Sequence, residues 1–151
     1  MIVDYIKGDI TETELPAIAH GCNCQNVMGS GVAKALFTKW QQVKTSYHSF
    51  CRSKHVDDLL GEVGVVDLKD RQILFNCFTQ FYYGYDNVRR VNYSALAKCF
   101  ITLNDSLRDS NLDNKLAIPK IGCGLAGGDW DIVKELIDDA TPDIEVYVYE
   151  L

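Results

Sequence analysis

The chain has 151 residues, 47% of them hydrophobic, so it can bury one core, and we expect a single domain over residues 1–151. Its 21 acidic residues outnumber its 15 basic residues, and the net charge of −6 excludes an extended nucleic-acid surface, which needs clustered Lys and Arg. No apolar run approaches the roughly 20 residues that cross a bilayer, so we expect no membrane partner.

The amino-terminal residues lack the charged and apolar segments of a secretory signal, which predicts a cytoplasmic protein. In that setting the cysteines are expected to remain thiols that pack in the interior rather than to form disulfides. Cys22 and Cys24 are one residue apart and lack a second ligand pair, so the spacing does not favour zinc, and we expect no metal or cofactor. The six cysteines are Cys22, Cys24, Cys51, Cys77, Cys99 and Cys123.

Predicted strands and helices alternate along the chain. Runs of β-branched and aromatic residues bounded by Gly, Asn or Asp predict strands, and apolar residues at steps of three and four predict helices. Strands separated by helices indicate the α/β class, here a mixed central sheet of about six strands with helices on both faces, in three layers. In chain order we predict a strand over 2–7, a strand over 17–20, a helix or helix pair over 32–54, a hairpin of strands 62–68 and 71–78 turning at Lys69 and Asp70, a loop over 79–90, a helix over 93–110, a strand over 115–119, a helix over 130–140 and a strand over 144–150.

Two Gly-rich stretches, residues 21–31 and 121–128, each connect a predicted strand to a predicted helix. Glycine lets the backbone turn and approach a ligand closely, and the first turn of the following helix presents free N–H groups. Two such loops predict an anion site that holds a diphosphate between them. The alternative is that both are tight turns without a ligand.

Two other phosphate chemistries fit the second stretch less well. Residues 122–127 match the dinucleotide fingerprint G-x-G-x-x-G, but a Rossmann unit needs a later acidic residue and further strands, and Glu150 is the only late candidate. In a thiol phosphatase, five residues separate the cysteine nucleophile from an arginine that holds the phosphoryl oxygens. Cys123 is followed at that distance by Asp129, whose carboxylate would repel a phosphate.

Four motifs, in the correct order, make the chain resemble the macrodomain family. The resemblance implies that the protein binds ADP-ribose or ADP-ribose 1″-phosphate, with ADP-ribosylated macromolecules as further partners. It also implies that Asp9 receives the adenine amino group with help from the Ile10 amide, and that Asn23 meets the distal ribose. The motifs are residues 7–11, 19–33, 119–125 and 146–151, and the implied ligand contacts also include Gly29, Ser30, Gly31, Val32, Gly122, Cys123, Gly124, Leu125, Ala126, Gly127 and Tyr149.

His20 and the short ending look most like the small branch of the family that includes ADP-ribose 1″-phosphate phosphatases and terminal ADP-ribose glycohydrolases. The glycohydrolase chemistry relies on a lysine after the hairpin and an aspartate after Gly-Cys-Gly-Leu. This chain has Phe-Thr-Gln-Phe over residues 78–81 and Ala126 at those places, so it lacks that nucleophile. The leading expectation is therefore a phosphatase acting on ADP-ribose 1″-phosphate. The alternatives are a reader that binds ADP-ribose without turnover, and a hydrolase that removes ADP-ribose from modified protein or nucleic acid.

Three residues are the candidate catalytic groups. His20 could act as a general acid or base, or stabilise the departing phosphate, and its alternative is a structural histidine. Asn23 could orient the distal ribose or a water molecule, and its alternative is to stabilise the loop. Asp129 could activate water or cap the helix that starts at Trp130. Asp9 likewise has an alternative as an Asx turn after Gly8.

Aromatic and basic residues gather in the loop predicted after the hairpin. Phe81, Tyr82 and Tyr83 could cover the distal ribose or form an edge of the core. Arg89 and Arg90 could reach an anionic substrate or form a solvated pair of charges.

Overall fold

The computed structural model describes residues 1–84 and 88–151. The strands form one mixed sheet, in which the first strand pairs with the last. Within those residues the strand order is β1-β6-β5-β2-β4-β3, and every neighbouring pair is parallel except β3 with β4. The strands are β1 (Ile2–Lys7), β2 (Ala17–Asn23), β3 (Val63–Asp67), β4 (Ile73–Gln80), β5 (Lys115–Ile118) and β6 (Glu145–Glu150). The helices are α1 (Gly31–Lys39), α2 (Gln41–Ser53), α3 (Tyr93–Arg108) and α4 (Trp130–Ala140), with 3₁₀ turns η1 (Ile10–Glu12) and η2 (Val56–Asp58).

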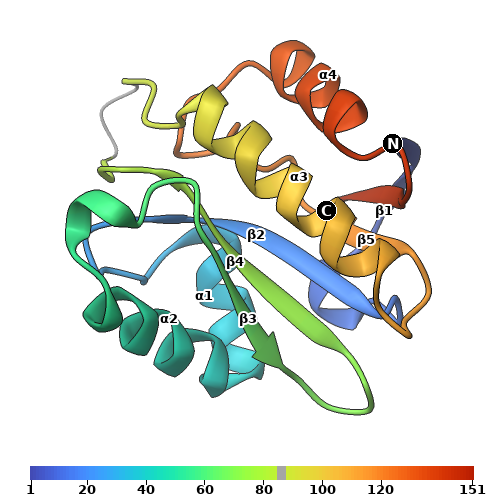
Figure 1. Cartoon of the computed structure of the whole chain (residues 1–151), viewed down its shortest axis with the longest axis horizontal. Helices are drawn as coiled ribbons and strands as arrows, with labels where there is room; N and C mark the ends of the chain where they lie inside the picture. The colour runs from blue at the N-terminus through green and yellow to red at the C-terminus, as the bar shows by residue number, and fades with distance from the viewer. Residues whose placement is uncertain (85–87) are drawn as a thin grey trace.

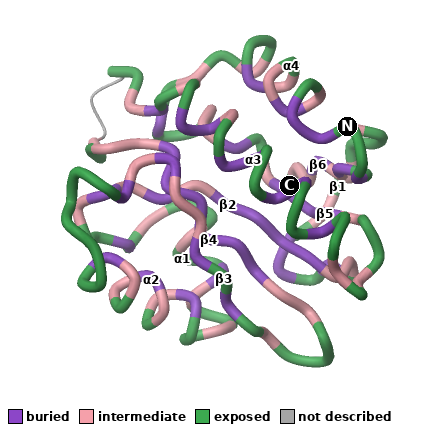
Figure 2. Tube along the Cα trace, in the orientation of Figure 1, coloured by how far each residue is buried: buried purple, intermediate pink, exposed green. Residues whose placement is uncertain are grey.

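Helices cover both faces of the sheet (Figure 1). Side chains of a strand alternate between the two faces, so β2 sends Ala17 and Ala19 into the core under α3 and α4, and Ile18 and Cys22 into the core under α1 and α2. Buried residues accordingly follow the central strands and the inner sides of the helices (Figure 2). The prediction of a mixed sheet of about six strands in a three-layer α/β/α arrangement is confirmed.

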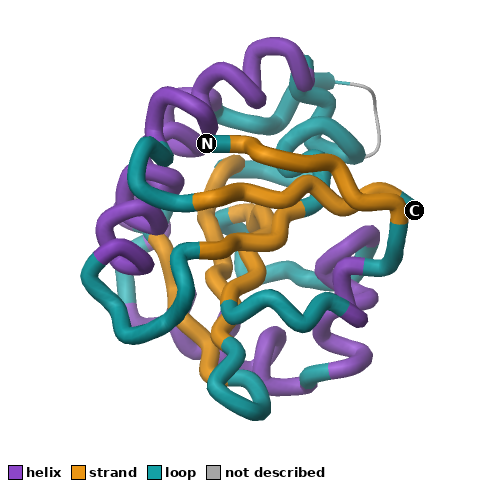
Figure 3. The backbone as a smooth tube through the Cα atoms, turned by 90° about the vertical axis from the view of Figure 1, so that its right-hand side faces the viewer, coloured by secondary structure: helices purple, strands orange, loops and turns teal. Residues whose placement is uncertain are grey.

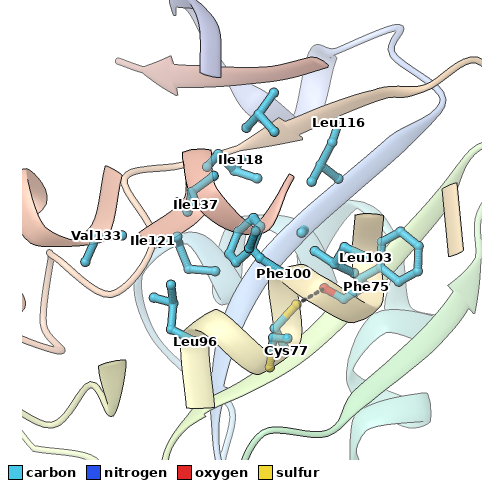
Figure 4. Close-up of a cluster of buried hydrophobic side chains, with 14 of the residues drawn as sticks. Phe75, Cys77, Leu96, Phe100, Leu103, Leu116, Ile118, Ile121, Val133 and Ile137 are labelled. Carbon is cyan, nitrogen blue, oxygen red and sulfur yellow. Dashed lines mark hydrogen bonds between the residues drawn. The ribbon is translucent and has the colours of Figure 1, made fainter. Parts of the chain in front are cut away.

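The core beneath α3 and α4 is the larger of the two (Figure 4). Phe100 and Leu103 of α3 are fully buried, as are Val133 and Ile137 of α4. Their apolar spacing on each helix follows the three- and four-residue steps that predicted these helices. Ile121 joins this core and so ties the loop after β5 to the sheet.

Two strands continue farther than their residue types predict. β2 runs to Asn23 and β4 to Gln80, so the prediction that residues 21–23 and 79–80 belong to loops is wrong. Parallel pairing supplies the reason, because Gly21 pairs with Cys77 and Cys22 with Phe78, and such backbone pairing overrides the weak strand propensity of Gly and Asn. Residues 85–87 of the predicted loop lie outside the described residues.

The other predicted elements lie close to their expected bounds. The pattern over residues 32–54 resolves into two helices that break at Trp40, whose backbone is extended. The hairpin is confirmed, but its turn lies one residue later than predicted, at Asp70 and Arg71, which both have positive φ as a tight two-residue turn requires. Five of the six cysteines are buried, and Cys123 is half-buried. Among the described residues, no helix is long and apolar enough to span a membrane.

The connections that leave β2 and β5 diverge to opposite faces of the sheet. β2 leads through a first loop, residues 24–30, to α1 on one face, while the neighbouring β5 leads through a second loop, residues 119–129, to α4 on the other. Figure 3, turned by 90° from Figure 1, shows helices on both sides of the strands and the loops at the strand ends. Ligands of open α/β sheets bind where connections part in this way, so the site is expected between the two loops.

Candidate functional site

A cavity of about 630 Å³ lies between the two loops, at the carboxyl ends of β2, β4 and β5. This volume falls within the range of about 300–1,000 Å³ that is usual for small-molecule sites. The cavity contains the candidate ligand-binding residues Gly29, Ser30, Gly31, Val32, Gly122, Cys123, Gly124, Leu125 and Ala126. The part of its lining that the structure describes consists of residues 20–23, 27–33, 79–80, 83–84 and 119–126.

A tyrosine of α2 determines the shape of the first loop. The amide of Val27 donates to Tyr47 Oη over 3.1 Å, and this hydroxyl lies 2.9 Å from both oxygen atoms of Asn23. Tyr47 is fully buried, and burial raises the pKa of its phenol well above the usual range, so the group stays a neutral donor. The sequence pattern placed Tyr47 on the apolar face of a helix and did not indicate this contact.

Replacement of Tyr47 by phenylalanine is expected to destabilise the protein by about 1–2 kcal/mol, because the Val27 amide and the Asn23 oxygens lose a shared partner. Chemical denaturation measures this loss. Tyr82→Phe is the matched control, since the Tyr82 side chain is exposed and its loss of a hydroxyl should leave stability unchanged. Equal stability of the two variants would contradict this role of Tyr47.

The side chain of Asn23 forms hydrogen bonds within the first loop. Its amide nitrogen donates to the Val27 carbonyl over 2.8 Å, and its amide oxygen accepts from the Gln25 backbone over 2.9 Å. These contacts favour the loop-stabilising alternative for Asn23 over the orientation of a water molecule. Asn23 still lines the cavity, so a contact with a bound sugar remains a prediction.

The amino-terminal end of α1 opens on the cavity. Ser30 occupies the capping position without making a side-chain cap bond, and Gly31 adopts a φ of +62°. The first N–H groups of a helix have no partner within it, and the helix dipole adds positive potential at this end. Gly31, Val32 and Ala33 of this first turn line the cavity, which makes it suitable for an anion.

The second loop contributes backbone groups rather than a helix end. The carbonyl of Ala126 accepts hydrogen bonds from the amides of Arg90 and Val91, at 2.7 and 3.1 Å, which anchor the loop. Among residues 1–84 and 88–151, no group accepts a hydrogen bond from the amides of Gly124 and Leu125. These amides are therefore free to bind a ligand.

Asp129 lies outside the cavity lining and caps α4. Its Oδ1 accepts from the Asp131 amide over 2.9 Å, which is the capping role that the sequence left as an alternative to water activation. The sequence predicted that the helix after each Gly-rich stretch presents free N–H groups to the ligand. The first turn of α1 lines the cavity, but that of α4 does not. Gly127, with φ of +70°, also lies outside the lining and shapes the turn instead.

His20 belongs to the cavity lining, but it is buried there, with 1% of its surface exposed. Asn76 donates through its amide nitrogen to the Val43 carbonyl, so its oxygen accepts from His20 Nε2, 2.5 Å away. Burial lowers the pKa of His20 to about 4, which keeps the ring neutral at pH 7. These features favour a structural histidine over a general acid.

Asp9 lies in a second, shallower hollow beside the cavity, with Gly31 on the border of both. Its Oδ1 accepts from the amide and the hydroxyl of Thr11, over 2.9 and 2.8 Å, and these bonds lower the pKa of Asp9. Ile10 is buried in the core under α1 and α2, and Tyr149 binds Thr13 through its hydroxyl over 2.7 Å. Neither Ile10 nor Tyr149 lines the cavity or the hollow, so the structure groups only Asp9 with the loops.

The charges around the cavity are few. Lys120 is the one charged residue in its described lining, and its Nζ lies 2.5 Å from Glu150 Oε1. No aspartate or glutamate belongs to that described lining, so the cavity offers hydrogen-bond donors and no carboxylate that could activate water. Among residues 1–84 and 88–151, no three His, Cys, Asp or Glu side chains gather as a metal site.

For the aromatic residues after β4 the sequence left two alternatives open, contact with the ligand or packing at an edge of the core. Tyr83 lines the cavity, whereas Tyr82 is exposed and Phe81 packs against the core under α1 and α2. The guanidinium of Arg89 lies 4.5 Å from the ring centroid of Tyr93, above its face. Thr79 and Gln80 also line the cavity, and the continuation of the apolar strand pattern past Phe78 was the signal that could have placed them there.

Comparison with known proteins agrees with this geometry. The Macro domain model matches residues 19–137, which include both loops and four of the six strands completely or in part. The chain belongs to the macrodomain family. The chain thus has the ADP-ribose-binding fold of this family.

Three curated relatives and one solved structure show how far the similarity extends. The chain is 34% identical to an uncharacterised 17.5 kDa protein of Enterobacteria phage T4, over 99% of this chain and 97% of that one. It is 24% identical to the ADP-ribose 1″-phosphate phosphatase of Candida albicans, over 91% and 93% of the two chains. Identity to the DNA ADP-ribosyl glycohydrolase of Mycobacterium tuberculosis is 25%, over 98% of this chain but 42% of the other. A macrodomain protein from Streptomyces coelicolor superposes with a TM-score of 0.82 at 27% identity, over 100% and 99% of the chains.

Proposed function

We propose that this macrodomain binds ADP-ribose 1″-phosphate between its two loops and hydrolyses the terminal phosphate ester. The observation that carries the proposal is the cavity itself, whose lining contains both the first turn of α1 and the residues Gly124 and Leu125 with their free amides. Backbone N–H groups from both sides suit a diphosphate, because they hold negative charge without a cationic side chain. An acidic protein can bind an anion in this way.

The dimensions of the sheet support a ligand that lies across the strand ends. Asp9 follows β1, and Thr79 lies at the end of β4, four strand positions away in the order β1-β6-β5-β2-β4. At about 4.8 Å per strand, this separation is about 19 Å, which suits an extended nucleotide sugar. With adenine near Asp9 and the diphosphate between the loops, the distal ribose lies toward β4.

The phosphatase activity is supported by the relatives and by the chemistry that the cavity permits. The Candida albicans phosphatase matches nearly the full length of both chains, so the resemblance covers a whole protein rather than one part. Phosphoryl transfer depends mainly on positioning and on stabilising charge on the phosphoryl oxygens, which loop amides can supply. The donor-rich lining therefore fits phosphate release better than a reaction that requires a carboxylate.

A reader that binds ADP-ribose without turnover is the second candidate. The lack of Asp and Glu in the described lining favours it, because such a cavity has no carboxylate that could serve as a general base. Where the glycohydrolase pattern has its lysine and its aspartate, this chain has Phe-Thr-Gln-Phe over residues 78–81 and Ala126. Of these residues, Thr79, Gln80 and Ala126 line the cavity. Removal of ADP-ribose from modified DNA or protein by a covalent lysine is therefore not proposed.

A matched pair of charge substitutions tests the site. Leu125 is 52% exposed in the second loop, and Ile132 is 43% exposed on α4 outside the cavity. Leu125→Glu is expected to weaken ADP-ribose binding at least about tenfold, because two like charges a few ångströms apart repel by about 1–4 kcal/mol. Ile132→Glu adds the same charge elsewhere and should bind as the unmodified protein does.

Calorimetry with ADP-ribose and a free-phosphate assay with ADP-ribose 1″-phosphate give three distinguishable outcomes. Binding together with phosphate release that Leu125→Glu diminishes would support the phosphatase. Binding without release would favour the reader. Absence of ADP-ribose binding by the unmodified protein would contradict both.

A further inference from the structure

Thr79 occupies an irregular position at the end of β4. Cys22 pairs with Phe78 and Asn23 pairs with Gln80, so Thr79 is an extra residue without a partner on β2. Such a bulge re-aims the side chain at the end of a strand. The Thr79 carbonyl accepts a hydrogen bond from the Asn92 amide over 2.8 Å, which ties the bulge to the start of α3.

The Thr79 hydroxyl is fully buried and has no hydrogen-bond partner among residues 1–84 and 88–151. A buried hydroxyl of this kind destabilises the free protein, because it has lost water without gaining a protein partner. Each such group in a native structure calls for an explanation. The position of Thr79 in the cavity lining provides one.

Gly21 leaves space beside this hydroxyl. A Cβ on Gly21 would lie 2.7 Å from Thr79 Oγ1 and 3.4 Å from Ile121 Cγ1, and all three residues line the cavity. The missing side chain thus leaves room next to the oxygen at the inner wall. Any larger residue at position 21 would cover the hydroxyl or displace it.

We propose that the Thr79 hydroxyl hydrogen-bonds the distal ribose, and that it determines specificity for that end of the ligand. This inference rests on the proposed function, which places the distal end toward β4. The side chains of Asn23 and Gln80 also lie near that end, but the Asn23 amide is bonded to Val27 and Gln25, and the Gln80 amide nitrogen donates to the Tyr82 carbonyl. Thr79 therefore supplies an uncommitted side-chain hydroxyl there.

Two ligands that differ only at the distal end provide the test. ADP has the adenosine and the diphosphate of ADP-ribose and lacks the distal ribose. Thr79→Val keeps the shape of the side chain and removes the hydroxyl, so it is expected to weaken ADP-ribose binding by about tenfold while ADP binding changes less than about twofold. Thr79→Ser keeps the hydroxyl and is expected to restore most of the ADP-ribose affinity.

Thermal unfolding of the free variants separates a ligand contact from a structural role. Because the hydroxyl has no partner in the free protein, Thr79→Val is expected to unfold at the same temperature as the unmodified protein or a higher one. Equal ADP-ribose affinity of Thr79→Val and the unmodified protein would overturn the inference. So would a parallel loss of ADP and ADP-ribose binding with a lower unfolding temperature. If the unmodified protein binds neither ligand, the proposed function itself fails, which is a distinct result.

Discussion

Gly128→Ala is expected to lower the free energy of unfolding by about 2–4 kcal/mol and to weaken ADP-ribose binding more than about tenfold. Gly128 closes the second loop, because its amide donates to the Gly122 carbonyl over 2.7 Å. A Cβ at this position would lie 2.5 Å from that same carbonyl oxygen and 2.8 Å from Val91 Cγ1. The two ends of the loop would have to separate, so the amides between them would lose their arrangement.

Gly124→Ala is the matched control for this substitution. Gly124 belongs to the same loop, but a Cβ there would meet nothing within 4 Å. We expect its free energy of unfolding to change by roughly 0.5 kcal/mol or less. Denaturation in urea measures both variants, and equal stability of the two would show that the contact between Gly128 and Gly122 does not hold the loop.

Stability is expected to fall by about 3 kcal/mol through His20 alone as the pH is lowered from 6.5 to about 4. The pKa of His20 is lowered in the folded protein, chiefly because burial disfavours the charged ring. Between these pH values the unfolded chain binds a proton that the folded protein does not, so acid favours unfolding. The contribution of His20 is complete above pH 6.5 and is lost as the pH approaches 4.

His20→Gln isolates this effect, because glutamine does not titrate and can still donate to Asn76. The difference in unfolding free energy between pH 7 and pH 4 should be about 3 kcal/mol smaller in His20→Gln than in the unmodified protein. His55→Gln, at an exposed histidine, should retain the full difference. A His20→Gln variant with unchanged pH dependence would mean that the buried ring is not held neutral.

The site explains how a chain with a net charge of −6 can bind an anion. Its donors are the first turn of α1 and the amides of the second loop, and only Lys120 in the described lining carries a positive charge. Lys120 is paired with Glu150, so little of its charge is left for a ligand. Binding through main-chain groups should therefore depend less on salt concentration than binding through clustered lysines.

Residue types predicted the order of the elements and the location of the binding loops. Gly31, which follows the first loop, and Gly122 of the second loop both have positive φ, a conformation that other residues adopt with strain. The roles of single polar residues were less predictable. Asn23 and Asp129 both have side chains bonded to nearby backbone amides, which short-range sequence patterns allowed but did not favour decisively over catalysis.

Local sequence determined which segments become strands and helices, because hydrophobic periodicity and glycine positions act over a few residues. It also determined the family, since the matching motifs are contiguous. Only the tertiary structure decided that His20 is buried against Asn76, 56 residues away. It also decided that Thr79 of β4 lies beside Gly21 of the neighbouring strand β2. The pairing of distant strands and the exclusion of water produce these relations, and neither is contained in a short stretch of residues.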